Sequence, residues 1–488
     1  MKIYFSDIFG VSAEKLKKYN AVDIALISDI PLFIDPFLLF NSKKPEYQNL
    51  HSEIIKYLSF LRKKSSEEDL SKGMFEAWYH FKEVHQTFLG FSETGNKGRG
   101  LGQKFAKALN RNLYRVFKDF GKEKVTSGTH LEKLCLIEQG IGKDAISDFT
   151  TNLIKWYLLE YTQEFSQKNI DKKFLRTILV PRVRFNYKTE SWMDEEFTLP
   201  FYEEDYVLLT PRNILTRGDN WINKEDLFSN FADIIPSISN SELRFKVSNY
   251  FQSFIPDFPT KKDFENATRG TIQKFPEVFD FYIKQKEDTG DRAVSMSESN
   301  VENSESIFIE NVREHYPRLA EKTDFEKVSG VTLPETRERI SYLKDFIENQ
   351  DGYQMLYDKQ KKPLDNEKYL QLMFRLIWWG SNLSVDREVN NGRGPVDYKI
   401  SMGAKDSTLV EFKLAKNPQL KRNLLNQVEV YAKANKTEQK VKVILFFSNE
   451  EKWRMNKILR ETNLQGSDDV VVIDASPKVS ASNDNTLF

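Results

Sequence analysis

The sequence predicts a multidomain protein of the α/β class, in which helices and strands are combined. With 488 residues, the chain is long enough for two to four domains, each with a core of its own. Hydrophobic residues make up 40% and charged residues 30%, and the aromatic share of 13% includes 37 Phe. This composition is typical of bulky, packed interiors rather than of disorder.

The first 285 residues divide into an α+β domain of unknown role, residues 1–215, and a helical region, residues 216–285. Apolar residues recur at three- and four-residue spacing in HSEIIKYLSFLRKK and SDFTTNLIKWYLLEYTQEF, which predicts helices. Short apolar runs between turn residues predict strands and loops for residues 1–45. Two strand-like stretches follow, at 174–185 and 197–211. We therefore expect a mostly helical α+β N-terminal region.

The rest of the chain contains a linker, a connector, a second core and a tail. Residues 286–306, KEDTGDRAVSMSESNVENSES, are polar and nearly free of large apolar side chains, which predicts a polar linker. A helical connector, 307–362, leads into a C-terminal α/β core, 363–474. The tail, 475–488, has no periodicity and is expected to be disordered.

Charge and cysteine content restrict the partners and the compartment. Basic and acidic residues both number 72, so any binding of nucleic acid must use local patches rather than a general positive field. Cys135 is the single cysteine, which excludes an intramolecular disulfide and Cys-based zinc sites. The first residues lack a signal-peptide pattern, and the longest apolar runs are too short to span a bilayer. We expect a cytoplasmic protein that does not enter membranes.

Four features follow one another in the C-terminal core. A helix begins near Glu367 and carries an apolar stripe. A glycine-containing turn at Gly392 and Gly394 then delivers Asp397 to the start of a strand. The next strand, TLVEFKL, alternates so that Glu411 and Lys413 share one face. The last feature is a second helix that carries Gln427.

These residue types suit phosphodiester hydrolysis. Asp397 and Glu411 can hold Mg²⁺, which prefers hard oxygen ligands and retains several waters. The metal lowers the pKa of a bound water and polarises a phosphoryl oxygen. Lys413 reaches the same pocket, where it can orient or deprotonate that water and offset developing charge.

The order of these motifs resembles the PD-(D/E)XK nuclease superfamily, and in particular the compact nuclease domains of bacterial defence and mobile-element proteins. The resemblance covers about 110 of the 488 residues. It implies a restriction-endonuclease-like α/β core with a mixed central sheet, and bound Mg²⁺ or Mn²⁺. It also implies that Asp397 and Glu411 are metal ligands and that Lys413 is the catalytic lysine. Glu367 would be an accessory metal ligand or a residue that orients the site, and Gln427 would contact either a metal ligand or the phosphate.

One departure from the family pattern lies next to the aspartate. Val396 separates Pro395 from Asp397, which gives P-V-D in place of an adjacent proline and aspartate. The aspartate carries the chemistry, so this change leaves the expected site intact.

Two basic groups are candidates for contact with nucleic acid. The first is a stripe at helical spacing, and its alternative interpretation is a solvated face paired with acidic neighbours. The second follows the catalytic strand directly. The stripe consists of Lys104, Lys107, Arg111, Arg115 and Lys118, and the second group of Lys416, Lys421 and Arg422.

The sequence thus predicts a Mg²⁺-dependent endonuclease that cuts nucleic acid, with DNA as the favoured substrate and antiphage or foreign-DNA defence as the implied role. A catalytically inactive nuclease fold that binds nucleic acid or a protein partner is the first alternative. A DNA repair or recombination nuclease is the second. The N-terminal region is expected to recognise a partner or to form a homo-oligomer.

Overall fold

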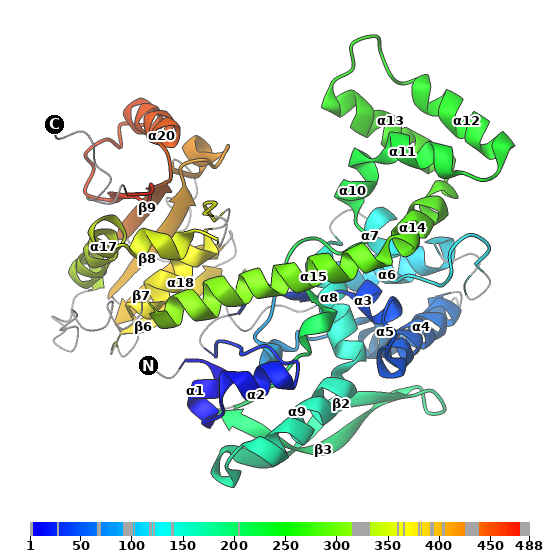
Figure 1. Ribbon diagram of the computed structural model, residues 1–488, viewed down its shortest axis with the longest axis horizontal. Coiled ribbons are helices and arrows are strands. Elements are labelled where there is room, and N and C mark those ends of the chain that lie inside the picture. The colour runs from blue at the N-terminus through cyan, green and yellow to red at the C-terminus, as the bar shows by residue number, and fades with distance from the viewer. Residues whose placement is uncertain are drawn as a thin grey trace. The chain divides into compact units, whose positions relative to one another are not determined.

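The computed structural model shows a chain of mixed helix and sheet that divides into two compact units (Figure 1). The N-terminal unit comprises Met1–Phe91 and Arg99–Glu302. The C-terminal unit comprises Asn303–Phe488 together with Ser92–Gly98. The structure describes all residues except 1–2, 27–28, 66–69, 91–100, 102, 117–119, 121–122, 138–140, 204, 315–331, 359–360, 365–366, 379–380, 382, 391–394, 403–405, 425–438 and 479–488.

The prediction of strands and loops for the first 45 residues holds in part. Loops, isolated bridges and one short strand are present, but three short helices were missed. Capping residues stabilise the starts of these helices. Ser12 accepts a hydrogen bond from the backbone N–H of Lys15, and Asp35 precedes Pro36 at the first helical position. One two-residue strand, β1, spans Phe33–Ile34 and pairs with β5, Leu215–Thr216. The short helices are α1 (Phe5–Phe9), α2 (Ala13–Lys18) and α3 (Pro36–Phe40).

Helices continue to residue 169, as the periodicity predicts. The long helix α4 buries one side, including Leu50, Ile54, Leu58 and Leu61, at the expected spacing of three and four residues. The helices of this stretch are α4 (Pro45–Ser65), α5 (Lys72–Tyr79), α6 (Gln103–Val116), α7 (Lys133–Ile137), α8 (Lys143–Leu153) and α9 (Lys155–Asn169).

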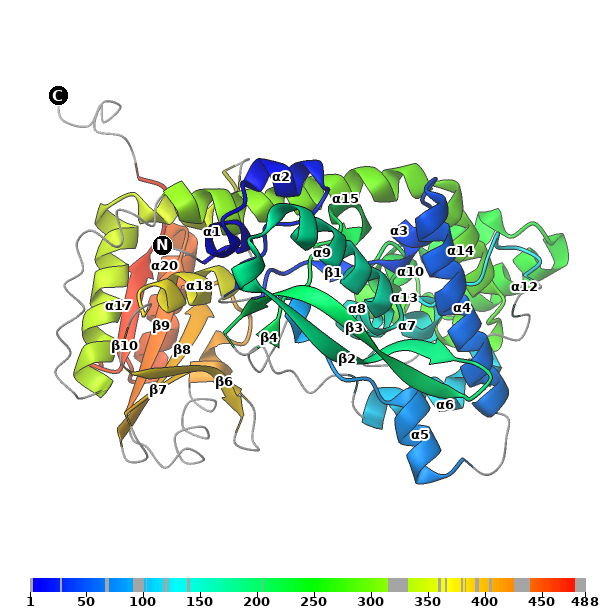
Figure 2. The same cartoon turned by 90° about the horizontal axis from the view of Figure 1, so that it is seen from below.

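A long antiparallel hairpin follows. It joins β2, Leu175–Asn186, to β3, Ser191–Tyr202, and the register shifts between Val180 and Arg184. The short strand β4, Asp205–Tyr206, pairs with the end of β3. Figure 2 shows α9 lying along this hairpin, where the amide oxygen of Gln163 accepts a hydrogen bond from the backbone N–H of Thr198. Strands were expected here, but β3 begins six residues earlier than predicted.

Helices make up the rest of the N-terminal unit, and the predicted polar linker was wrong. Residues 290–305 form a helix whose small or β-branched residues Ala293, Ser297 and Val301 are buried, one turn apart. The linker was predicted because this segment has few large apolar residues. Small side chains can nevertheless pack in a core, so a segment of this composition can form a buried helix. The helices are α10 (Lys224–Ser229), α11 (Phe231–Ile234), α12 (Ser241–Gln252), α13 (Lys261–Lys274), α14 (Val278–Asp288) and α15 (Gly290–Glu305).

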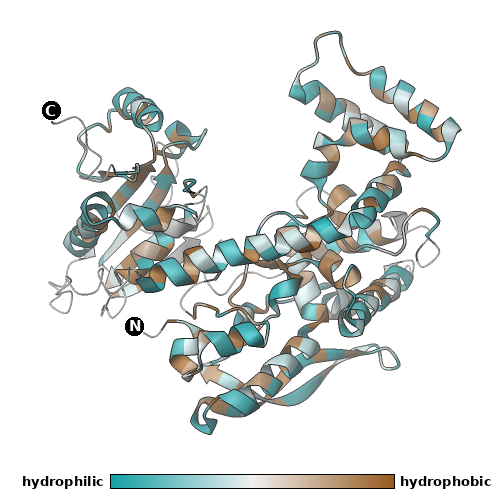
Figure 3. Ribbon diagram, viewed as in Figure 1, coloured by the Kyte–Doolittle hydropathy of each residue, from teal (hydrophilic) through white to brown (hydrophobic). Residues whose placement is uncertain are grey.

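The C-terminal unit is built on a mixed five-stranded sheet with the order β10-β9-β8-β7-β6. The pairs β6–β7 and β7–β8 are antiparallel, whereas β8–β9 and β9–β10 are parallel. The strands at its centre are mostly hydrophobic (Figure 3). Their bounds are β6 (Ser384–Asn390), β7 (Pro395–Met402), β8 (Asp406–Leu414), β9 (Lys440–Phe446) and β10 (Val470–Asp474).

Helices pack against this sheet. The helix α17 (Thr332–Asn349) contacts β7, β8 and β10, and Phe374 of α18 (Lys368–Leu376) packs on Tyr398 and Phe412. On the opposite face, Ile444 and Phe446 lie in one cluster with Met455 and Leu459 of α20 (Asn449–Glu461). Because β8 alternates, Phe412 points to the first face and leaves Glu411 and Lys413 on the second.

The predicted boundary of the tail needs correction. Ala475 is fully buried, and its backbone N–H donates to the carbonyl of Phe446, so the chain stays packed beyond the last strand. Residues 479–488 lie outside the described part. Among the described residues, no helix is both long and apolar enough to cross a bilayer. Cys135 is buried as a free thiol.

The core of the N-terminal unit contains a histidine that resists protonation. His51 is 8% exposed and lies against Phe40, with ring centroids 5.2 Å apart. Burial, and to a lesser degree the neighbouring His130, lowers the pKa of His51 to about 3. An imidazole of ordinary pKa takes up its proton near pH 6.5, so between these two values only the unfolded chain gains a proton at this position.

We therefore expect His51 to make the protein sensitive to acid. Its contribution to stability is fully present above pH 6.5 and is lost as the pH falls towards 3. His51→Phe should reduce the fall in the free energy of unfolding between pH 7 and pH 5 by about 2 kcal/mol. Urea denaturation at both pH values measures this. Equal losses in the variant and the wild type would contradict the prediction.

Candidate active site

The first feature of the site is the close approach of Asp397 and Glu411. Tyr398 pairs with Val410 at the last position of the β7–β8 ladder, so one step further along the two strands Asp397 lies opposite Glu411. At this position a side-chain hydrogen bond takes the place of a backbone one: Asp397 Oδ2 accepts a hydrogen bond from the backbone N–H of Phe412 at 2.6 Å. The backbone N–H of Asp397 in turn donates to Glu411 Oε2 at 3.3 Å. The strand pairing thus fixes both carboxylates.

Lys413 lies between three carboxylates. Its Nζ is 2.7 Å from Glu411 Oε1, 3.5 Å from Glu367 Oε2 and 3.7 Å from Asp397 Oδ2. The ammonium also donates to the carbonyl of Phe412 at 2.8 Å. The side chains of Lys413 and Glu411 are only 8% and 5% exposed. The structure therefore brings together all four residues of the predicted catalytic group that it describes.

The helix α18 supplies two of the groups around this cluster. Glu367, at its N-cap position, accepts a hydrogen bond from the backbone N–H of Leu414 at 3.1 Å. One turn later, Gln371 donates from Nε2 to Asp397 Oδ1 at 2.7 Å, and it is 5% exposed. The sequence analysis missed Gln371. Gln371 follows Glu367 by four residues, so the two lie on the same side of a helix. This spacing could have identified Gln371 as a site residue from the sequence.

A second missed residue is Lys442. It pairs in register with Glu411 across the parallel β8–β9 ladder, so both side chains point to the same face of the sheet. Lys442 is 3% exposed, and its Nζ donates to the carbonyl of Leu424 at 2.9 Å. A lysine within the apolar strand KVKVILF was the sequence signal for this residue.

The buried charges shift one another's protonation. Burial, together with the Asp397 carboxylate, raises the pKa of Glu411 to about 8, although Lys413 partly offsets this rise. For Lys413, burial by itself would lower the pKa, but the carboxylates of Asp397, Glu411 and Glu367 outweigh burial and raise the pKa. Lys413 is therefore held as a cation, and its charge is the counterion that allows carboxylates to be buried here.

The donor set fits a hard divalent cation in its chemistry. Glu367, Asp397 and Glu411 present carboxylate oxygens, the ligands that Mg²⁺ and Mn²⁺ prefer, and they already surround one positive charge. In the described part of the chain, no group of three or more His, Cys, Asp or Glu side chains has an arrangement ready to hold a metal ion. The Lys413 ammonium, rather than a metal ion, lies between the three carboxylates.

The basic residues after the catalytic strand are only partly accessible for contact with nucleic acid. Lys421 forms an exposed ion pair with Glu461 at 2.7 Å, and Arg422 is exposed. Lys416 is half-buried, and its backbone carbonyl accepts a hydrogen bond from Arg454. These residues belong to the same unit as the carboxylate cluster.

Other predicted residues lie in the N-terminal unit or outside the described part. Lys107 and Arg111 are exposed on α6, as a basic stripe requires. Lys104 and Arg115 lie within α6, but their side chains are outside the described part. Four further predicted positions also lie outside the described residues, namely Lys118, Gly392, Gly394 and Gln427.

We expect Lys413→Met to destabilise the C-terminal unit when metal is removed with EDTA. The substitution keeps an unbranched side chain but removes the cation shared by three carboxylates, which should cost ~3 kcal/mol. Mn²⁺ should then stabilise the variant more than the wild type. Chemical denaturation with EDTA or Mn²⁺ measures both effects.

The matched control is Lys421→Met, which removes an exposed ion pair in the same unit and should leave stability nearly unchanged, because solvent screens such pairs. If Lys413→Met is as stable as the wild type in EDTA, the ammonium is not the counterion of this cluster.

Comparison with known proteins gives two family matches and no function. Residues 10–223 match the family described as "Domain of unknown function (DUF8370)". Residues 332–449, which include the carboxylate cluster, match the family described as "Domain of unknown function (DUF8371)". No curated protein and no solved structure matches the chain.

Proposed function

We propose that this protein is a metal-dependent nuclease whose C-terminal unit has a restriction-endonuclease-like core. The observation that supports this most is the convergence of Asp397, Glu411 and Lys413 from two adjacent strands, with Glu367 joining them from a helix. This set combines hard oxygen ligands with a buried cation, as phosphodiester hydrolysis requires. DNA is the proposed substrate, and defence against foreign DNA is the proposed role.

Each residue of the cluster has a separate task in this proposal. Asp397 and Glu411 hold the divalent cation, with Glu367 as an accessory ligand. When bound, the cation supplies Lewis acidity, which polarises a phosphoryl oxygen and lowers the pKa of a coordinated water. Lys413 donates hydrogen bonds to the phosphoryl oxygens and offsets the negative charge that builds on them. Burial of this lysine excludes water that would screen its charge.

Gln371 acts as a positioning residue. Its amide holds one oxygen of Asp397, and the Phe412 backbone N–H holds the other, so the carboxylate is fixed at both ends. Hydrogen bonds of this kind orient metal ligands and tune their affinity. The hydroxyl of Tyr398 donates to the backbone carbonyl of Gln371, which ties the helix to the strand.

One observation favours an alternative function. The Lys413 ammonium fills the space between the carboxylates, so the cluster is electrostatically satisfied without a metal ion. A non-catalytic module that binds nucleic acid or a protein through a nuclease-like core would have the same property. Cleavage assays distinguish these two functions.

The proposal predicts metal-dependent cleavage that depends on the cluster. Purified protein should cut plasmid or linear DNA with Mg²⁺ or Mn²⁺ and not with EDTA. Asp397→Asn, Glu411→Gln and Lys413→Met should each reduce the rate by at least ~100-fold, because each removes a metal ligand or the charge that offsets the transition state. Glu367→Ala should leave measurable activity. Gel assays on plasmid, linear duplex, single-stranded DNA and RNA measure this.

Lys457→Met, which changes an exposed lysine on α20 of the same unit, should cut at nearly the wild-type rate. If the wild type cuts no substrate with either metal while it still binds nucleic acid, the binding module replaces the nuclease.

Gln371→Met provides a separate test of positioning. Loss of the hydrogen bond to Asp397 should raise the Mg²⁺ concentration needed for half-maximal cleavage by about 10- to 100-fold. A purely structural role would lower activity without changing the metal requirement. Gln419→Met is the matched control, since Gln419 is exposed in the same unit. An unchanged metal requirement in Gln371→Met would refute the positioning role.

A further inference from the structure

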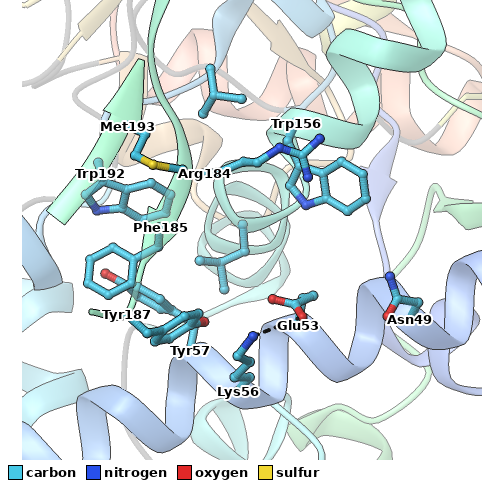
Figure 4. A pocket seen from close by; sticks show the side chains of 12 residues that line it. Asn49, Glu53, Lys56, Tyr57, Trp156, Arg184, Phe185, Tyr187, Trp192 and Met193 are labelled. Atoms are coloured by element: carbon cyan, nitrogen blue, oxygen red, sulfur yellow. Dashed lines mark hydrogen bonds and ion pairs between the residues drawn. The ribbon is translucent and has the colours of Figure 1, made fainter. Parts of the chain in front are cut away.

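The N-terminal unit contains a pocket that the proposed nuclease chemistry does not use. It lies between α4, the α8–α9 junction and the β2–β3 hairpin, and its volume is about 280 Å³ (Figure 4). The side chains of Leu153 and Val183 line it and are almost completely buried, so part of its surface is aliphatic. A volume near the lower end of the range for ligand sites suits a single ring system rather than a large ligand.

Aromatic rings form two walls of this pocket. On one side, Tyr57, Phe185 and Trp192 pack together with ring centroids 5.0 to 5.4 Å apart, and Tyr187 joins them through Phe185. Figure 4 shows Trp156 across the pocket from this group. The guanidinium of Arg184 lies 4.1 Å from the centroid of the Trp156 ring. A flat ligand would therefore meet aromatic side chains on two sides.

The rim of the pocket is polar. Asn49, Glu53 and Lys56 lie three and four residues apart on α4, so they share one side of that helix. Lys56 is 54% exposed in its side chain; its Nζ is 3.3 Å from Glu53 Oε1 and 4.5 Å from the centroid of the Tyr187 ring. The rim thus offers an amide, a carboxylate and an ammonium above apolar walls.

We propose that this pocket binds a nucleotide, with the base between the aromatic walls and the phosphate towards Lys56. Bases stack on aromatic side chains regardless of sequence, and the amide and carboxylate on the rim can pair with the polar edge of a base. A second ligand class, organic cations, also binds to aromatic faces. Here Lys56 and Arg184 already lie over the Tyr187 and Trp156 rings. Lys56 is paired with Glu53 and Arg184 with Glu160 and Glu195, so these ring faces are already occupied by cations of the protein and are not open to a further one.

This inference goes beyond the proposed nuclease and does not depend on cleavage. A nucleotide can be free or can be part of a single strand, and the chemistry of recognition is the same in both cases. A base within a duplex is stacked and paired, so a duplex should not fill the pocket.

The test measures binding to the full-length protein in EDTA, so that no metal-dependent cleavage can occur. The probes are fluorescein-labelled oligo(dT) and oligo(U), followed by fluorescence anisotropy, and AMP, GMP, CMP and UMP as competitors. A duplex of equal length, whose bases are stacked and paired, serves as the negative control. We expect single strands to bind, and binding should weaken as salt is added.

Two variants address the pocket. Trp156→Leu removes one aromatic wall and should weaken binding about 10-fold or more. Lys56→Glu reverses an exposed charge, so it should fold normally and still weaken binding. The matched controls are Trp453→Leu and Lys168→Glu, which change an exposed tryptophan and an exposed, locally ion-paired lysine that do not line the pocket.

The outcomes separate the sources of the ligand. Competition by a mononucleotide identifies a free nucleotide as sufficient, whereas binding of oligonucleotides without such competition identifies a single strand. The proposal is overturned if neither class binds, or if Trp156→Leu and Lys56→Glu bind as tightly as the controls. Glu411→Gln should lose cleavage but keep this binding, so failure of the nuclease proposal and failure of the nucleotide proposal give different results.

Discussion

The C-terminal unit depends on one electrostatic constraint, the burial of a lysine ammonium among three carboxylates. Unpaired charges are costly to remove from water, so Lys413 and its partners can be buried only together. Glu367 and Asp397 also bond to backbone N–H groups of β8, which ties the ion cluster to the strand ladder. The same arrangement makes the cluster a candidate for chemistry, because buried charges act with little screening by water.

The rest of this unit holds that cluster in place. The apolar face of β8 packs Phe412 against Phe374 and Tyr398, which leaves the opposite face of the strand for the charged pair. Arg339, fully buried on α17, pairs with Glu335, donates to the carbonyl of Ile377 and covers the Trp378 ring at 4.4 Å. The Arg339–Glu335 pair lies within α17, and the contacts of Arg339 with Ile377 and Trp378 connect this helix to the end of α18. The helices α17 and α18 therefore both stabilise the unit and position the candidate catalytic residues.

In the N-terminal unit, one part of the core is built from aromatic side chains. Tyr57 alone contacts Phe81, Phe185 and Trp192, and its hydroxyl donates to the carbonyl of Trp78. Tyr57, Phe185 and Trp192 also line the pocket beside the β2–β3 hairpin, and its rim residues come from a helix more than 100 residues earlier in the chain.

The sequence by itself determined the features that local periodicity controls. The alternation of TLVEFKL placed Glu411 and Lys413 on one face, and the three- and four-residue spacing located α4, α9 and the apolar stripe of α18. Local reasoning failed at the short capped helices before residue 45 and at α15, whose buried residues are small and therefore do not stand out by composition.

Only the tertiary structure decided which distant groups meet. Gln371 contacts Asp397 because α18 crosses the start of β7, and Lys442 lies beside Glu411 because β8 and β9 pair in one particular register. The aromatic pocket depends in the same way on a helix and a hairpin that are far apart in the sequence. Periodicity specifies which face a side chain occupies, whereas the neighbour across that face depends on non-local packing that no local pattern encodes.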